Sequence, residues 1–199
     1  MTCLPWTVPA RPVAAAFAER SGVAFVGGYR PAPNADAARF LVEQVMPLAW
    51  QQAPGIEVVL VGSTMPDAVR RLAGRRVRAL GHVPDLGAVL DRVRLTAAPL
   101  RYGAGLKGKV LTSLAAGLPC AMAPVAAEGM ALPKPLARCV AATPEALAAV
   151  IVALHEDPAR NRAAAEAGLA WVRQACSAER VDRLLAEACG LAPAEASPA

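Results

Sequence analysis

One stretch, residues 95–129, constrains the fold of this chain more than any other. It reads LTAAPLRYGAGLKGKVLTSLAAGLPCAMAPVAAEG. Its apolar runs and glycines predict, in order, a buried strand at Leu95–Ala98, a basic glycine-rich loop at Arg101–Lys109, a helix over about Lys109–Ala116, a stop at Gly117 and a second strand at Pro119–Ala123. A strand, loop, helix and strand in so short a span predict an α/β unit with parallel strands.

The loop within this stretch has the features of a phosphate site. A glycine-rich loop that runs into a helix presents free backbone N–H groups and the positive end of the helix dipole. Arg101, Lys107 and Lys109 add positive charge to the same loop. We therefore expect a phosphorylated ligand there, although lysines on a solvated face are the alternative.

The same alternation of strands and helices continues on both sides of this stretch. Further strands are predicted at Val23–Val26, Ile56–Val61, Val77–Leu80 and Cys139–Ala141. Helices are expected after Asn34 as an N-cap, with an interruption or kink at Pro47, from Pro66, and from Asp85. The pattern predicts an α/β fold: one Rossmann-like domain with a parallel sheet of about six strands flanked by helices, followed by C-terminal helices.

The ends of the chain differ from this central region. Residues 1–22 are proline-rich and predict an N-terminal arm on the surface, while residues 23–175 form the domain and residues 176–199 a C-terminal helix and disordered tail. Helices are expected from Thr143 and from Asp157. A third begins at Ser177, ends at Gly190 and carries an apolar stripe of Val181, Leu184, Leu185 and Ala188.

Composition excludes several functional classes. The net charge of +5 suits a protein that handles anions, but the arginine cluster at residues 70–78 lacks interleaved aromatic residues, so a solvated face is favoured over nucleic-acid binding. The five cysteines form no Cys-x-x-Cys pair, and only two histidines are present, so neither a metal site nor a disulfide framework is expected. No signal peptide is predicted, and residues 110–127 are interrupted by glycine and prolines, so we expect a cytoplasmic chain without a transmembrane segment.

Ligands of parallel sheets bind at the carboxyl ends of the strands. Four segments meet there in the predicted topology: Gly27–Arg30, Gly62–Ser63, Gly81–Pro84 and Arg101–Lys109. The glycines after the first two strands carry little weight alone, because glycine is common at turns between strand and helix.

Five segments, in this order, resemble the group 1 (family 4) glycosyltransferases. They are FVGGYRPAPNADAARFLVEQVMP, VVLVGS, ALGHVPDL, APLRYGAGLKGKVLTSLAAGLPC and APVAAEGM, and the resemblance covers about residues 23–175. Such enzymes have the GT-B architecture of two Rossmann-like halves, and this chain is similar to the C-terminal half, which holds the nucleotide-sugar donor.

The resemblance implies a role for each segment. Donor binding is assigned to Gly27, Gly28, Arg30, Gly62, Ser63, His82, Val83, Gly105, Lys107, Gly108, Lys109, Thr112 and Glu128. In this assignment the first glycines, Arg30 and the lysines meet the diphosphate, and the loop at His82 meets the nucleobase. It further implies a retaining, metal-independent transferase that needs no cofactor besides its donor substrate, and it assigns no catalytic residue. The alternatives are a structural role for His82, a surface carboxylate at Glu128 and a Thr112 hydroxyl bonded to its own helix.

Two departures from the family pattern affect the expected activity. The family has two glutamates eight positions apart where this chain has Ala104 and Thr112. A neutral hydroxyl contributes roughly 1 kcal/mol where a charged acceptor gives about 1.5–3 kcal/mol, so weaker donor binding is expected. The resemblance covers only the donor-binding half, so we expect the acceptor site to require a separate N-terminal half, and the stripe of the last helix predicts docking to such a half or self-association. A noncatalytic nucleotide-binding or nucleotide-sugar-binding module and a vestigial interaction protein are the alternative functions.

Overall fold

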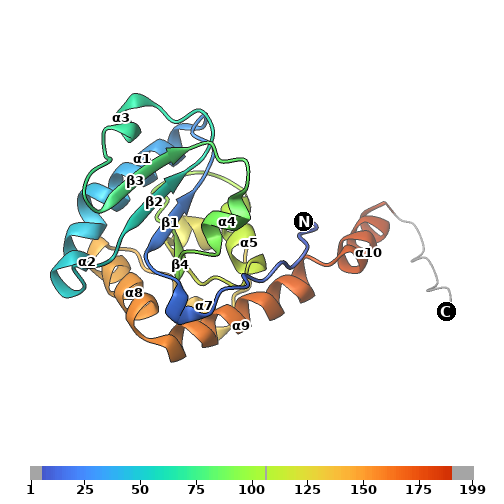
Figure 1. The fold of residues 1–199 in the computed structure, drawn as a ribbon. Coiled ribbons are helices and arrows are strands. Elements are labelled where there is room, and N and C mark those ends of the chain that lie inside the picture. Colours follow the sequence, from blue (N-terminus) through green and yellow to red (C-terminus); the bar gives the residue numbers. More distant parts are fainter. Residues whose placement is uncertain (1–5, 106, 190–199) are drawn as a thin grey trace.

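A parallel sheet of five strands forms the centre of the computed structural model, which describes residues 6–105 and 107–189 (Figure 1). The strand order is β3-β2-β1-β4-β5, and every neighbouring pair is parallel. The strands are β1 (Val23–Val26), β2 (Val58–Val61), β3 (Val77–Gly81), β4 (Leu95–Ala98) and β5 (Cys120–Met122). Their near-continuous apolar sequence is typical of a sheet that is covered on both faces.

The sixth predicted strand, Cys139–Ala141, is wrong as a full strand. Val140 forms only a single parallel bridge with Met122. The N–H groups of Cys139 and Val140 donate to carbonyls of the preceding helical turn, at 2.9 and 3.2 Å, and only Ala141 donates to the sheet, at 2.9 Å to Met122. Pairing therefore stops after one residue.

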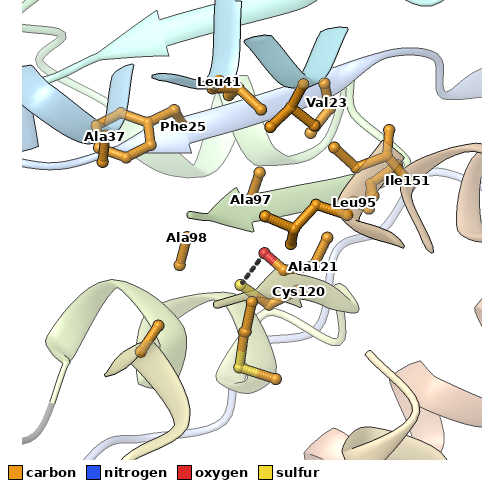
Figure 2. Close-up of a cluster of buried hydrophobic side chains, with 14 of the residues drawn as sticks. Val23, Phe25, Ala37, Leu41, Leu95, Ala97, Ala98, Cys120, Ala121 and Ile151 are labelled. Atoms are coloured by element: carbon orange, nitrogen blue, oxygen red, sulfur yellow. Dashed lines mark hydrogen bonds between the residues drawn. The ribbon is translucent and has the colours of Figure 1, made fainter. Parts of the chain in front are cut away.

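Helices cover the two faces of the sheet. One face is covered by α1 (Ala32–Phe40), the π-helical turn η2 (Leu41–Val45), α2 (Met46–Gln52), α3 (Asp67–Arg70) and α8 (Pro144–Glu156). The other face is covered by α4 (Leu86–Leu90) and α5 (Gly108–Ala115). Figure 2 shows part of the larger core cluster, in which Phe25 of β1 and Leu95 of β4 meet Leu41 and Ile151 from the helices. Because side chains alternate along a strand, Ala24 belongs to the smaller cluster on the opposite face.

The first helical segment differs from the sequence prediction at its N-cap, whereas the irregularity expected at Pro47 takes the form of a π-helical turn. Its N-cap is Pro31, not Asn34, whose side chain instead bonds to other loops. The segment continues through Pro47 to Gln52, and the turn directly before this proline is π-helical. Proline has no N–H for the carbonyl four residues earlier and its ring clashes with that carbonyl, so the wider turn relieves an interruption that would end a regular helix.

The chain leaves the sheet through α6 (Pro124–Ala127) and α7 (Lys134–Ala137), and after α8 continues into α9 (Pro158–Ala175) and α10 (Ala178–Ala188). Thr143, Asp157 and Ser177 cap the last three helices with their side chains, as predicted. Figure 1 shows α10 projecting from the body of the domain, and none of its residues is buried. The expected stop at Gly190 and the tail at 192–199 lie outside the described residues. None of the described helices is long and apolar enough to span a bilayer.

The N-terminal arm, of which residues 6–22 are described, lies along the helices. The N–H of Val8 donates to the carbonyl of Cys176 at 3.2 Å, and that of Arg11 to Ala115 at 2.8 Å. The arm also forms a short 3₁₀ helix, η1 (Phe17–Glu19), that the sequence pattern does not predict. Its path crosses the end of α9 and then the C-terminal end of α5.

Candidate functional site

The loops after β1, β2 and β3 are joined to one another at the carboxyl edge of the sheet. The N–H of Tyr29 donates to the carbonyl of Ser63 at 2.9 Å, and that of Gly62 to the carbonyl of Gly81 at 2.8 Å. A Cβ on Gly62 would lie 1.8 Å from the carbonyl oxygen of Gly27, and its φ is +152°. Only glycine allows this approach, so the edge is built from closely packed backbone.

Lys109 reaches from α5 across the loop that follows β1. A Cβ on Gly27 would lie 3.3 Å from the Cε of Lys109, so the lysine stem lies over that glycine. Its Nζ donates to Oδ1 of Asn34 at 2.7 Å, and Nδ2 of Asn34 donates to the carbonyl of Gly28. Burial lowers the pKa of Lys109, and the positive charge of Lys107 lowers it further.

Lys107 is the N-cap residue of α5 and is only 8% exposed. Its Nζ donates to the carbonyl of Gly105 at 2.5 Å. Within residues 6–105 and 107–189, neither Lys107 nor Lys109 has a carboxylate within ion-pair distance. Buried charges in proteins are ordinarily paired, so two neighbouring cations bound to neutral amide oxygens are typical of a site for an anionic ligand.

Arg101, the third basic residue of this loop, is compensated within the protein. Its guanidinium donates two hydrogen bonds to Asp36, with Nε 2.9 Å from Oδ2, and lies 5.3 Å from the ring centroid of Phe40. The hydrogen-bonded carboxylate raises the pKa of Arg101. The uncompensated positive charge of the loop is therefore that of the two lysines.

The loop into α5 depends on glycine conformations. Gly103 and Gly105 have φ angles of +135° and +73°, a region that side chains with a Cβ rarely adopt. At the first helical residue, a Cβ on Gly108 would lie 2.8 Å from Cζ3 of Trp6. Hence the indole of the N-terminal arm lies against the first turn of α5. No sequence pattern predicts this contact.

The remaining predicted residues lie around this centre. Arg30, Ser63, His82 and Glu128 are exposed, and Val83 is half-buried beyond the end of β3. Thr112 lines a groove between α4 and α5. The structure thus brings together the loop glycines, Ser63 and both lysines, whereas no hydrogen bond of the described residues joins Arg30, His82 or Glu128 to the lysines.

Asn34 and Asp36 are the partners of the basic residues that could not be identified from the sequence. Both lie in the first turns of α1, and they bind Lys109 and Arg101 at separations of 75 and 65 residues. No local spacing links such partners. The one available signal was the position of the two polar residues directly after the Gly27–Gly28 turn.

A comparison with family models matches residues 20–157 to the glycosyl transferases, group 1. The chain belongs to this family. A search of the curated proteins gave no match.

Solved structures share the fold at low sequence identity. HepE of Anabaena, in complex with UDP and glucose, has a TM-score of 0.69 and 17% identity over 87% of this chain and 49% of its own. TarM of S. aureus, in a complex that contains UDP, has a TM-score of 0.77 and 12% identity, and the match covers 91% of this chain and 38% of TarM. Sucrose-phosphate synthase from Thermosynechococcus elongatus has a TM-score of 0.74 and 21% identity, and the match covers 94% of this chain and 51% of the synthase. This chain therefore spans about half, or less, of the structures that it matches, and its α/β domain corresponds to one half of a GT-B fold.

Proposed function

We propose that this chain is the donor-binding domain of a group 1 glycosyltransferase and holds a nucleoside-diphosphate sugar for transfer to an acceptor. The observation that carries the proposal is the pair of partly buried lysines at the start of α5, Lys107 and Lys109, which have no carboxylate partner among the described residues. A diphosphate would supply the missing negative charge. UDP complexes of HepE and TarM support this class of ligand, although they leave the base and sugar of this chain open.

The lysines would act on the leaving group of the reaction. When the bond between sugar and phosphate breaks, negative charge develops on the diphosphate. We propose that Lys107, Lys109 and the N–H of Gly108 at the helix N terminus stabilise that charge, so the proposed reaction needs no divalent metal. Gly27 and Gly28 let the ligand approach the backbone closely, and retention of the anomeric configuration is the expected outcome.

The other donor contacts of the proposal follow the family pattern. The loop at His82 and Val83 would bind the nucleobase through its backbone, Thr112 the ribose, and Glu128 the donor sugar. Arg30 and Ser63, both exposed at the same edge of the sheet, would also contact the diphosphate.

A complete enzyme would need a second half for the acceptor. Helix α10 is the surface through which we propose that this half, or a second copy of the chain, docks. Its stripe of Val181, Leu184 and Leu185 is half-buried to exposed, with Leu185 at 42% exposure. Ala104 and Thr112, in place of the two family glutamates, favour a second candidate function, a noncatalytic module that binds the nucleotide.

Thermal denaturation with UDP, GDP and ADP and their sugar conjugates tests the proposal. At about 1 mM ligand, a dissociation constant of about 10 µM would add roughly 2.7 kcal/mol to the free energy of unfolding, a shift of several degrees. The matching nucleosides, which lack phosphate, are the control and should give a much smaller shift. The absence of a shift with every nucleotide would contradict the proposal. Binding without sugar transfer, even with the acceptor half present, would favour the noncatalytic module.

A further inference from the structure

A groove runs between α4 and α5, and its outer wall is the N-terminal arm. The groove is open to solvent and has a volume of about 650 Å³, within the range of small-molecule sites. The start of α4 contributes Asp85 and Leu86, α5 contributes Thr112 and Ala115, and the arm contributes residues 8–9 and 11–14. The predicted ribose position, Thr112, therefore faces a segment that the sequence analysis treated only as a surface arm.

The arm is held in place along this groove by backbone hydrogen bonds. The N–H groups of Arg11 and Val13 donate to the carbonyls of Ala115 and Ala116 at 2.8 and 3.0 Å. The N–H of Ala14 donates to Oδ1 of Asp91 at 3.0 Å. These bonds tie the arm to the end of α5 and to the residue that follows α4, so it forms a fixed wall.

Trp6 lies at the end of this wall that is nearest to the two lysines. Its indole contacts Gly108 so closely that a Cβ there would lie 2.8 Å from Cζ3, yet 60% of the residue is exposed. Gly108 and Thr112 are four residues apart in α5 and therefore lie on one face of the helix. The contact of Trp6 with Gly108 therefore lies about 6 Å along the helix axis from Thr112, where the groove begins.

We propose that the N-terminal arm is part of the nucleotide site: the nucleoside lies in this groove, and Trp6 stacks against it. This inference rests on the proposed function, because it takes the diphosphate to lie at the N terminus of α5. A nucleoside attached to that diphosphate must lie close to the first turns of the helix. The groove begins at Thr112, one turn further along the helix, where Leu86 and Ala115 give it an apolar lining. The exposed part of the indole at Gly108 offers a surface on which a base or ribose can stack.

The fluorescence of Trp6 gives a direct test. The chain has three tryptophans, and the double variant Trp50→Phe/Trp171→Phe leaves Trp6 as the only one. Trp50 and Trp171 donate to the carbonyls of Ile56 and Ala131, away from the groove. Titration with UDP, GDP and ADP should change the emission of Trp6 along a saturation curve. Its midpoint should match the dissociation constant of the unmodified chain by calorimetry.

Substitutions at the contact test the same inference by affinity. Trp6→Ala should weaken binding of the preferred nucleotide about tenfold, whereas Trp6→Phe, which keeps an aromatic ring, should retain most of the affinity. Gly108→Ala should displace the indole and weaken binding, but should add little loss in the Trp6→Ala background because the ring is already absent. Circular dichroism and melting curves establish that each variant is folded.

Two results would overturn the inference, and they differ in what else they contradict. If the unmodified chain binds a nucleotide while Trp6→Ala binds it equally well and the Trp6 emission is unchanged, the arm is not part of the site and the proposed function stands. If the unmodified chain binds none of the three nucleotides, the inference and the proposed function both fail.

Discussion

Replacing Lys109 by methionine separates ligand binding from folding. Methionine keeps a long unbranched stem over Gly27 but removes the ammonium group. A charge-assisted hydrogen bond to a phosphate oxygen contributes about 1.5–3 kcal/mol, so loss of about 2 kcal/mol predicts nucleotide binding about 30-fold weaker. The free energy of unfolding should change little. Burial and the charge of Lys107 lower the pKa of Lys109, which means that the charged ammonium is unfavourable in the folded protein, and methionine removes this unfavourable term. That relief offsets part of the loss of the hydrogen bond to Asn34, which has a charged donor and is worth about 1.5–3 kcal/mol.

Calorimetric titration with the preferred nucleoside diphosphate, together with urea unfolding, measures both effects. Lys134→Met is the matched control, because Lys134 is exposed on α7 and its replacement lowers the net charge equally. We expect wild-type affinity for the control, and a free energy of unfolding within about 1 kcal/mol of wild type for Lys109→Met. The pKa of Lys109 in the folded protein lies below the ordinary 10.5. Nucleotide binding to the wild-type chain should therefore weaken as the pH rises through this pKa, because the ligand binds the charged form of the lysine. Affinities of Lys109→Met and Lys134→Met within twofold of each other would refute this reasoning.

Three further predictions concern stability and assembly. Gly62→Ala should lower the free energy of unfolding in urea by at least about 3 kcal/mol, because its Cβ would overlap a carbonyl oxygen. Gly55→Ala is the control, because Gly55 has open space around it and its replacement should change stability little. Equal stability of the two variants would contradict the packing argument. Buried His155 accepts the N–H of Gly22 at 2.8 Å and burial lowers its pKa below 6.5. The unfolded chain therefore binds the proton more readily, and stability should fall as pH drops below about 6.5; His155→Leu should be less stable at pH 8 and lack this dependence, and an unchanged pH profile would disprove the assignment. Leu185→Glu on α10 should abolish any dimer seen by light scattering without changing the melting temperature, whereas a dimer that persists would exclude this face as the contact.

The sheet could be predicted from sequence because its strands are short apolar runs between glycines and helix caps. The bounds of β1 and β4 agree with the prediction residue by residue, and the other three strands differ by one or two residues at their ends. The sixth strand failed because hydrogen bonds of the preceding turn use the N–H groups of Cys139 and Val140. Whether these N–H groups bond to the turn or to the edge strand depends on how the segment is placed in the folded chain. The apolar character of the segment does not predict that placement.

The site was predictable at the level of loops and not at the level of contacts. The glycine turns and the basic loop were predicted at one edge of the sheet, because the carboxyl ends of parallel strands lie at the same edge. It could not show that Asp36 compensates Arg101, or that Asn34 binds Lys109 instead of capping α1. Both pairs form because β1 and β4 are neighbours in the sheet, which brings the start of α1 next to the loop before α5. The contact of Trp6 with Gly108 depends likewise on the path of the arm.

Calorimetric titration of the unmodified chain with UDP, GDP and ADP tests the central claim most directly. Lys107 and Lys109 have no carboxylate partner in the part of the chain that the structure describes, and they predict binding of at least one nucleotide with a dissociation constant near 10 µM, corresponding to about 7 kcal/mol. That affinity should fall with added salt, since it depends on charge. Dissociation constants above about 1 mM for every nucleotide, equal to those of the Lys107→Met/Lys109→Met variant, would contradict the account.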